Sequence, residues 1–415
     1  MKHILLLSAL LTWAVASTGQ NKNYDESQVP TFEVPDALTC SDGTRVKTRK
    51  QWENKRRPEL LKLLSEQEYG FTPWQTGIRA KYELVATNTD ALGGLATQKQ
   101  VRFVFTGMNG RTHEALLLLY LPNSTAKRVP VIISYNFQGN QTTTMQDDVI
   151  FSPSKSAESE KQVRGEQQSR WCFEMALQRG YAVATMCYQD ICPDSPDLLA
   201  QGVLPLFPDY NEGPRTPSEW GTIGVWAWGY SRIADYLQKK EPRIDGKRMV
   251  VMGHSRLGKT VLWAGAQDKR FRVVISNDSG CGGAALSKRV FGETIAHITG
   301  NFPHWFCPAF SAYSGNEAAL PFDQHELLAL IAPRHVYVAS AQDDLWADPK
   351  GEFLSAFYAG SVYQLYRMKG LPEDQQPPVH QPLHYDVGYH IRTGGHDVTA
   401  YDWQCYLDFC DKVLK

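Results

Sequence analysis

Short apolar runs alternate with longer amphipathic segments over most of the chain beyond residue 128. Strands are predicted for the apolar runs 129–135, 181–186, 248–253, 271–275 and 335–340. Helices are predicted for the segments 171–179, 223–238, 257–268 and 400–413. Strands that alternate with helices in this way form a parallel sheet covered by helices on both faces. The pattern therefore predicts an α/β fold in three layers, with a mostly parallel central sheet between two layers of helices.

The region before this alternation has a different pattern. Residues 101–105 alternate between apolar and polar side chains, and residues 115–121 form a continuous apolar run, so both segments are expected to be strands. A helix is expected to begin at Pro58. The basic run at residues 55–57, just before it, is expected to lie on a solvated face.

No linker-like break interrupts the pattern, so we expect one catalytic domain over residues 46–415. Residues 17–45 are polar and irregular and are expected to form an N-terminal arm. Length alone would allow two to four domains, but α/β folds often form one larger unit.

The first 16 residues have the order of a secretory signal peptide. Lys2 gives a positive start, an apolar stretch follows, and Ala14-Val15-Ala16 is a small-x-small cleavage pattern. The alternative is a buried first strand or helix. The stretch is too short to span a bilayer comfortably, and no other segment reaches the length of a membrane span. We therefore expect an exported protein, either periplasmic or secreted.

Charge and composition exclude several classes of protein. The 415 residues include 43 Lys and Arg against 44 Asp and Glu, and this balance argues against a nucleic-acid partner. With 42% hydrophobic and 21% charged residues, the composition is that of a globular protein. Eight cysteines have no zinc-finger spacing to histidines, and their pairing does not follow from the sequence. No zinc-binding or dinucleotide motif is present, so no metal or organic cofactor is expected.

The strongest chemical signal is a serine at a predicted strand-to-helix turn. Gly253-His254-Ser255-Arg256-Leu257-Gly258-Lys259 follows an apolar strand directly and opens a helix. A nucleophile elbow needs this context, because a tight turn raises the serine hydroxyl above the sheet. The glycine expected two residues after the serine is replaced by Leu257, so the elbow is a variant. The alternative is an ordinary turn.

An acid and a histidine follow the serine in the order of an α/β-hydrolase triad. Asp344 comes just after the predicted strand 335–340, and His396 lies on a glycine-rich loop before the last helix. A serine hydroxyl is too weakly acidic to attack alone, so a histidine must accept its proton and a carboxylate must orient that histidine. His390 is the nearest rival for the base, and a structural role is expected for it.

The chain resembles the glucuronoyl esterases of carbohydrate esterase family 15, especially the bacterial members. The similarity extends from about residue 50 to the C-terminus. The motifs that carry it lie at residues 253–259, 277–285, 289–294, 304–307, 320–327, 343–349 and 394–399.

The resemblance implies a role for each matching residue. Ser255 matches the family nucleophile and His396 its base. Arg256 matches an arginine that faces the oxyanion together with backbone amides. Polar and aromatic positions of the uronic-acid pocket are matched by Lys259, Glu293 and Trp346.

The triad acid has two candidate positions in the family, and this chain has a carboxylate at both. Asp278 stands where relatives usually carry the longer Glu, so we expect Asp344 to be the main acid and Asp278 its partner or substitute. Fungal members also carry a disulfide beside the serine. Its positions are occupied here by His254 and Val398, so that bridge is not expected.

The resemblance implies a serine esterase that cleaves esters of (4-O-methyl-)glucuronic acid on glucuronoxylan, as in lignin–carbohydrate linkages. One alternative is another hydrolase, such as an acetyl-xylan esterase or a peptidase. Another is an inactive hydrolase fold that binds glycans. The polar groups at Lys259 and Glu293 argue against an acetyl esterase, and the complete triad argues against an inactive fold. The sequence does not indicate an oligomeric state.

Overall fold

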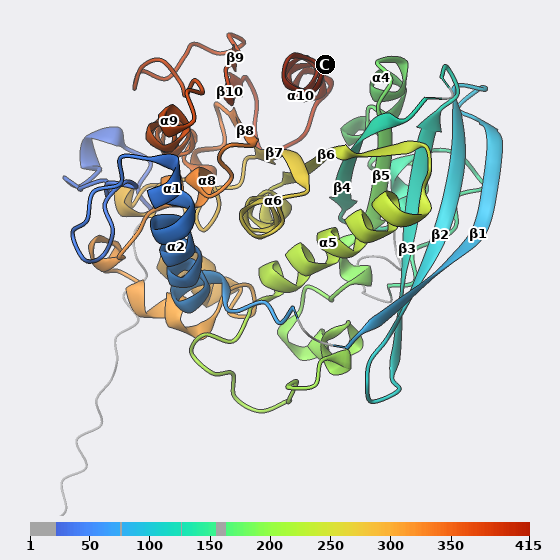
Figure 1. Cartoon of the computed structure of the whole chain (residues 1–415), viewed down its shortest axis with the longest axis horizontal. Helices are drawn as coiled ribbons and strands as arrows, with labels where there is room; N and C mark the ends of the chain where they lie inside the picture. Colours follow the sequence, from blue (N-terminus) through green and yellow to red (C-terminus); the bar gives the residue numbers. More distant parts are fainter. Residues whose placement is uncertain (1–21, 75–76, 126, 155–162) are drawn as a thin grey trace, which may run out of the picture.

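The computed structural model describes residues 22–74, 77–125, 127–154 and 163–415. The expected signal peptide therefore lies outside the described residues. A single ten-stranded sheet runs through the molecule in the order β1-β2-β3-β5-β4-β6-β7-β8-β10-β9 (Figure 1). The strands are β1 Arg79–Ala91, β2 Ala96–Thr106, β3 Thr112–Pro122, β4 Val129–Asn136, β5 Ala182–Cys187, β6 Ile244–His254, β7 Phe271–Asn277, β8 His335–Ala341, β9 Leu383–His384 and β10 Val387–Arg392.

The centre of the sheet is parallel and its edges are antiparallel. Strands β5, β4, β6, β7, β8 and β10 pair in parallel, whereas β1, β2 and β3 form an antiparallel meander on one side. β3 joins β5 in antiparallel, and β9 closes the other edge against β10. The predicted mostly parallel sheet between helices is confirmed.

Helices cover both faces of the sheet, with α4 and α10 on one side and α5 and α6 on the other (Figure 1). The helices are α1 Arg49–Gln51, α2 Arg57–Leu64, α4 Phe173–Gln178, α5 Thr222–Lys240, α6 Arg256–Gln267, α7 Ile295–Asn301, α8 Gln324–Ala329, α9 Pro349–Leu365 and α10 Ala400–Leu414. Within the described residues, no helix is both long and apolar enough to cross a membrane.

The unbroken apolar runs of the central strands fill two cores. In β6, Met249 and Val251 pack into the core beneath α5 and α6, whereas Val250 and Met252 pack into the core beneath α4 and α10. Successive side chains of a strand point to opposite faces, so a strand covered on both faces is apolar at most positions. This burial explains why these strands show no polar alternation.

The basic run before α2 does not lie on a solvated face as a whole. Arg56 is 5% exposed and forms ion pairs with Glu59 and Glu326. Arg57 is 7% exposed and donates to the backbone carbonyls of Ala266 and Leu330. The expectation of a solvated run was therefore wrong for these two arginines, because both are buried and their terminal guanidinium nitrogens bond to acceptors within the fold.

Candidate active site

Every predicted site residue lies at the carboxyl end of the parallel strands. Ser255 follows β6, Asp278 follows β7, Asp344 follows β8 and His396 follows β10. The carboxyl ends of parallel strands share one edge of a sheet, and the loops beyond that edge build the sites of open α/β folds. The topology therefore gathers residues that are far apart in the sequence.

Ser255 sits on a strained turn between β6 and α6. Its φ of 59° and ψ of −129° lie in a region that residues with side chains rarely adopt. Close packing of the flanking glycines makes this turn possible. A Cβ on Gly253 would lie 2.1 Å from the Leu257 carbonyl oxygen, and one on Gly258 would lie 2.8 Å from the Ser279 Cβ. Gly258 thus brings α6 against the loop after β7, although it stands one residue later than the usual elbow glycine.

His396 is bound by one of the two candidate acids. Its Nδ1 lies 2.5 Å from the Asp344 Oδ2. The Asp344 side chain is buried, whereas that of His396 is partly exposed. A hydrogen bond to Nδ1 fixes the ring orientation and leaves Nε2 free to accept a proton.

Asp278 lies close to this pair but forms no hydrogen bond through its carboxylate within the described residues. One nitrogen or oxygen from each of Asp278, Asp344 and His396 lies within 4.8 Å of the others. The nearest cation to Asp278 is Arg392, whose Nη2 is 3.6 Å from the Asp278 Oδ2. Burial, followed by the neighbouring carboxylates of Glu352 and Asp344, raises the pKa of Asp278 well above its usual value. Asp278 therefore favours its neutral form.

The His254 ring lies beside the His396 ring. Its ring centroid is 4.4 Å from that of His396, and its Nδ1 lies 2.6 Å from the Asn277 Oδ1. Burial, together with the nearby His396, holds the pKa of His254 well below its usual value. A neutral His254 adds no positive charge beside the His396 ring.

Arg256 is held in place by an acid that the sequence analysis did not identify. Its Nη1 is paired with Asp194 and lies 3.4 Å from the Tyr188 hydroxyl. The rings of Trp305, Phe302 and Phe137 surround the guanidinium, with the Trp305 centroid 4.9 Å away. The Arg256 side chain remains 28% exposed, so part of it is still accessible from solvent.

Asp194 is the common acceptor of the groups that surround Arg256. Besides Arg256, it accepts hydrogen bonds from the Tyr188 hydroxyl at 2.8 Å, His304 Nε2 at 2.8 Å and Trp305 Nε1 at 2.6 Å. Burial opposes its ionisation, but these donors and the Arg256 charge lower the pKa of Asp194 to about 2. Asp194 is thus an anion at any pH near neutrality. Only its place just after the predicted strand 181–186 could have suggested it from the sequence.

The three pocket residues implied by the resemblance contact one another. Lys259, one helical turn after Ser255, donates from Nζ to the Ser279 carbonyl oxygen at 2.5 Å and lies 3.6 Å from the Glu293 Oε2. The Glu293 N–H donates to the Trp346 carbonyl oxygen at 2.9 Å, and the Trp346 side chain lies near the Glu293 carboxylate and favours its ionised form. Burial raises the pKa of Glu293, and Lys259 opposes this shift. The result is a mixed wall of ammonium, carboxylate and indole groups.

His390, the rival candidate for the base, lies away from Ser255 and has structural partners. His390 is fully buried in β10, where its Nε2 lies 2.8 Å from the Asp402 Oδ1 and its Nδ1 lies 3.0 Å from the Tyr337 hydroxyl. All eight cysteines belong to the described residues, and each is free. The roles assigned to individual site residues stay predictions, and the geometry above shows only that these residues are assembled in one place.

Comparisons with known proteins point to one family. A family model described as glucuronyl esterase, fungi, matches residues 210–366. A carbohydrate esterase, MZ0003, from an unknown prokaryotic organism is 43% identical over 402 residues, which cover 94% of this chain and 91% of the relative.

Solved structures agree with this relationship. The glucuronoyl esterase from Solibacter usitatus superposes with a TM-score of 0.87 at 41% identity, covering 94% of this chain and all of the other. A promiscuous esterase of carbohydrate esterase family 15 from a marine bacterial metagenome superposes with a TM-score of 0.86 at 42% identity, with the same coverage. The chain is a carboxylic-ester hydrolase and belongs to carbohydrate esterase family 15, the glucuronoyl esterases.

Proposed function

We propose that the protein is an exported serine esterase that cleaves the ester between the carboxyl group of (4-O-methyl-)glucuronic acid on glucuronoxylan and an alcohol, as in lignin–carbohydrate linkages. The observation that carries the proposal is one site that combines two sets of groups. Ser255, His396 and Asp344 supply acyl-transfer chemistry, while Lys259, one helical turn after Ser255, forms a polar and aromatic wall with Glu293 and Trp346. Export is supported by the charged, apolar and small-residue order of residues 1–16.

In the proposed mechanism, the Ser255 hydroxyl attacks the ester carbonyl and His396 accepts its proton. The developing oxyanion faces the Arg256 guanidinium and the first backbone N–H groups of α6, which have no acceptor within the helix. His396 then returns the proton to the leaving alcohol, and a water molecule releases glucuronate from the acyl-enzyme. Asp344 holds His396 in its tautomer and stabilises the imidazolium.

The contacts of Asp194 make it the positioning residue of the oxyanion arginine, since it acts on the substrate only through Arg256. Replacing Arg256 with Met is expected to lower kcat by about 100-fold to 1000-fold, the usual effect of losing an oxyanion donor. Asp194→Asn keeps the shape but removes the charge, so we expect kcat to fall by roughly tenfold with little change in KM.

A double-mutant cycle separates positioning from general damage to the fold. If Asp194 acts through Arg256, adding Asp194→Asn to the Arg256→Met protein should lower kcat almost no further. Steady-state kinetics of the four proteins on methyl glucuronate, with Tm as the stability control, measure this coupling. Fully additive losses would show that Asp194 supports the fold and not the arginine.

The wall formed by Lys259, Glu293 and Trp346 predicts that a change at Lys259 affects two substrates differently. Lys259→Met keeps most of the buried volume but removes the ammonium. A hydrogen bond from a charged donor contributes about 1.5–3 kcal/mol when buried, so kcat/KM for methyl glucuronate is expected to fall by roughly tenfold to 100-fold. An acetyl ester presents no sugar ring at this position and should lose much less.

The matched control is Lys288→Met, because Lys288 is also buried and donates from Nζ to backbone carbonyls, those of Ala318 and Leu320. Lys288→Met should change kcat/KM for methyl glucuronate and for the acetyl ester by the same factor. Simple esters are an informative second substrate, since a relative of this chain is described as promiscuous. If Lys259→Met lowers kcat/KM equally for both substrates, Lys259 supports the elbow and not the sugar. If the unmodified enzyme prefers the acetyl ester, the protein is better described as an acetyl esterase.

A further inference from the structure

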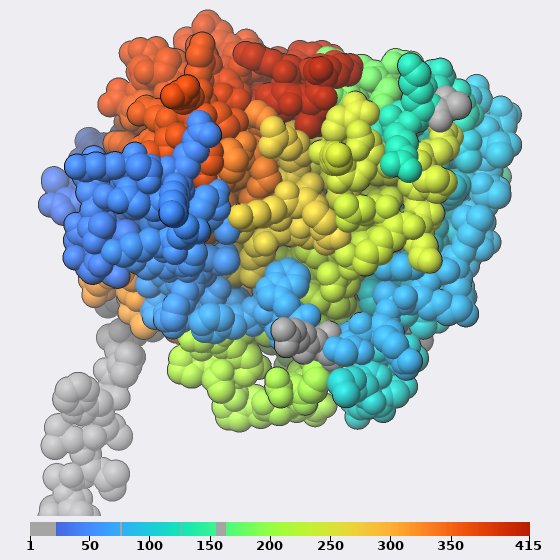
Figure 2. All heavy atoms as spheres, in the orientation of Figure 1, coloured from blue at the N-terminus to red at the C-terminus, as the bar shows by residue number. Residues whose placement is uncertain are grey.

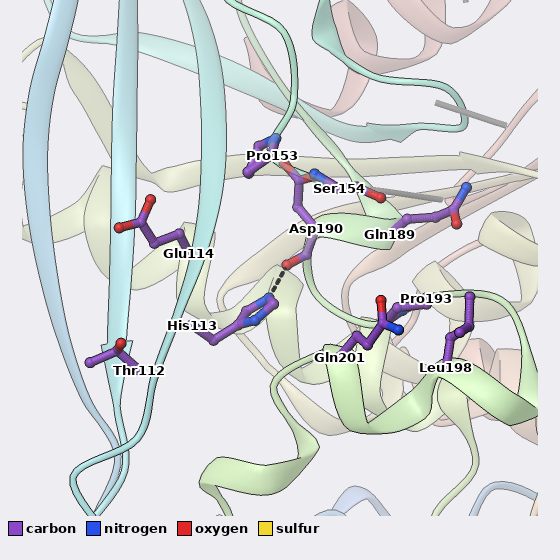
Figure 3. Close-up of a pocket in the computed structure, with 10 residues that line it drawn as sticks. All are labelled: Thr112, His113, Glu114, Pro153, Ser154, Gln189, Asp190, Pro193, Leu198 and Gln201. Carbon is purple, nitrogen blue, oxygen red and sulfur yellow. Dashed lines mark hydrogen bonds between the residues drawn. The ribbon is translucent and has the colours of Figure 1, made fainter. Parts of the chain in front are cut away.

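The buried polar groups around the cavity of about 340 Å³ beside the start of β3 already have partners (Figure 3). His113 Nε2 lies 2.6 Å from the Asp190 carbonyl oxygen, and the Asp190 carboxylate accepts the backbone N–H groups of Leu116 and Ser154. Among the lining residues, all of which are described, no buried side-chain nitrogen or oxygen lacks a hydrogen-bond partner. The cavity therefore indicates no ligand.

The N-terminal arm, by contrast, reaches the uronate wall, which is the wall formed by Lys259, Glu293 and Trp346. Residues 22–26 of the arm lie against the two loops that carry Glu293 and Trp346. The contacted segments are residues 289–292 and 346–350. The blue N-terminal segment accordingly lies beside α9 and other orange parts of the chain (Figures 1 and 2).

A backbone hydrogen bond attaches the arm to the first of these loops. The Gly292 N–H donates to the Asn23 carbonyl oxygen at 2.8 Å, one residue before Glu293. Gly292 has a φ of 62°, and a Cβ at this position would lie 2.6 Å from the Trp346 carbonyl oxygen. Gly292 therefore contacts both the arm and the Trp346 backbone, so a shift of the arm would disturb the place where Glu293 and Trp346 meet.

Ion pairs attach the arm a second time. Glu26 Oε1 lies 2.6 Å from Arg289 Nη2, and Glu26 Oε2 lies 3.0 Å from Lys350 Nζ. Arg289 is 3% exposed, and its Nε also lies 2.8 Å from the Oδ2 of Asp348, two residues after Trp346. Because Arg289 bonds Glu26 and Asp348 together, it joins the arm to the second loop.

Lys22 lies over the Trp346 ring itself. Its Nζ is 4.8 Å from the ring centroid, within the range of a cation–π interaction. The His297 ring is also a neighbour of this indole, with the two centroids 5.2 Å apart. The indole is therefore restrained by Lys22 and His297, in addition to the backbone bond from Glu293 to Trp346.

We infer that residues 22–26 are a positioning element of the uronate wall, with Lys22 acting through Trp346 and Glu26 acting through Arg289. The inference rests on the proposed function. It makes the discrimination between uronate esters and simple esters depend on a segment that precedes residues 46–415, over which the catalytic domain is predicted. The arm acts on the wall and not on the triad, so its loss should raise KM for a glucuronate ester and leave kcat unchanged.

Steady-state kinetics on methyl glucuronate and on an acetyl ester test the inference. Lys22→Met combined with Glu26→Ala removes both side-chain contacts and should raise KM for methyl glucuronate by about threefold to tenfold. Neither kcat for methyl glucuronate nor KM for the acetyl ester should change. Lys22→Arg alone keeps a cation over the ring and should keep the unmodified KM. Glu33→Ala, at an exposed glutamate later in the arm, is the matched control and should change neither substrate.

Hydrogen exchange measures the attachment of the arm independently of turnover. The Gly292 amide is bonded to the arm, so a peptide covering residues 289–293 should exchange faster in the double variant than in the unmodified protein. The Glu33→Ala protein should exchange like the unmodified protein.

Two results would overturn the inference. One is an unchanged KM for methyl glucuronate in the double variant, whether or not residues 289–293 exchange faster. The other is an equal rise of KM on both substrates, which would show that the arm supports the whole site and not the wall. Failure of the unmodified enzyme on methyl glucuronate would instead refute the proposed function, and the exchange experiment would still decide whether the arm holds the loop.

Discussion

Replacing Ser255 with alanine is expected to abolish ester hydrolysis, with kcat reduced by about 10⁵-fold to 10⁶-fold. In the proposed mechanism Ser255 forms the acyl-enzyme, and without it the oxyanion donors and binding contacts supply only residual catalysis. Alanine has the same backbone restriction at a φ of 59°, so the strain of the turn is retained and the fold should not change.

Three measurements check this prediction together. Steady-state assays on methyl glucuronate give the loss of kcat, thermal unfolding gives Tm, and a fluorophosphonate reagent reports covalent labelling. The altered protein should keep its Tm within a few degrees and lose labelling. Ser311→Ala, a change at an exposed serine, is the matched control and should retain both labelling and activity. A Ser255→Ala protein that keeps most of its activity would refute the serine mechanism.

The layers of the fold could be predicted because each buried parallel strand appears in the sequence as a short apolar run. Residues 249–253 of β6 and most of β8 form unbroken apolar runs, and the helices between them are bounded by turns. Helix α9, Pro349–Leu365, was not predicted. It is buried around much of its circumference, so it lacks the polar stripe that identifies a surface helix. Short β10 was missed for a related reason, since its six buried residues include His390 and Arg392, which are polar in the sequence but paired with Asp402.

The candidate site was predictable where local geometry carries the information. Ser255 and Lys259 lie one helical turn apart, and this spacing alone places them on one side of α6. Asp194 was not predictable in the same way. Its partners come from the end of β5, from α6 and from residues 304–305, and only the folded chain brings these donors around one carboxylate.

The two candidate acids are expected to contribute very unequally. Asp344 bonds His396 directly, so Asp344→Asn should lower kcat by about 10³-fold to 10⁴-fold, as losing the triad carboxylate does. Asp278 forms no bond to His396 in the described structure, and burial beside Glu352 and Asp344 raises its pKa, which favours its neutral form. A neutral carboxyl group does little to stabilise an imidazolium. Asp278→Asn should therefore lower kcat by about tenfold or less, and the double replacement should lower kcat more than either single change.

The dependence on pH distinguishes a reserve acid from a structural residue. Because the pKa of Asp278 is raised, the fraction of ionised Asp278 grows as the pH rises. The ratio of Asp344→Asn activity to unmodified activity should therefore increase between pH 6 and pH 9, and the increase should disappear in the double variant. Assays of kcat for the four proteins across this range decide the assignment. If Asp278→Asn alone removes activity and Asp344→Asn does not, the roles are reversed. If the ratio is flat with pH, Asp278 does not act as a reserve for Asp344, because its growing negative charge then brings no catalysis to His396.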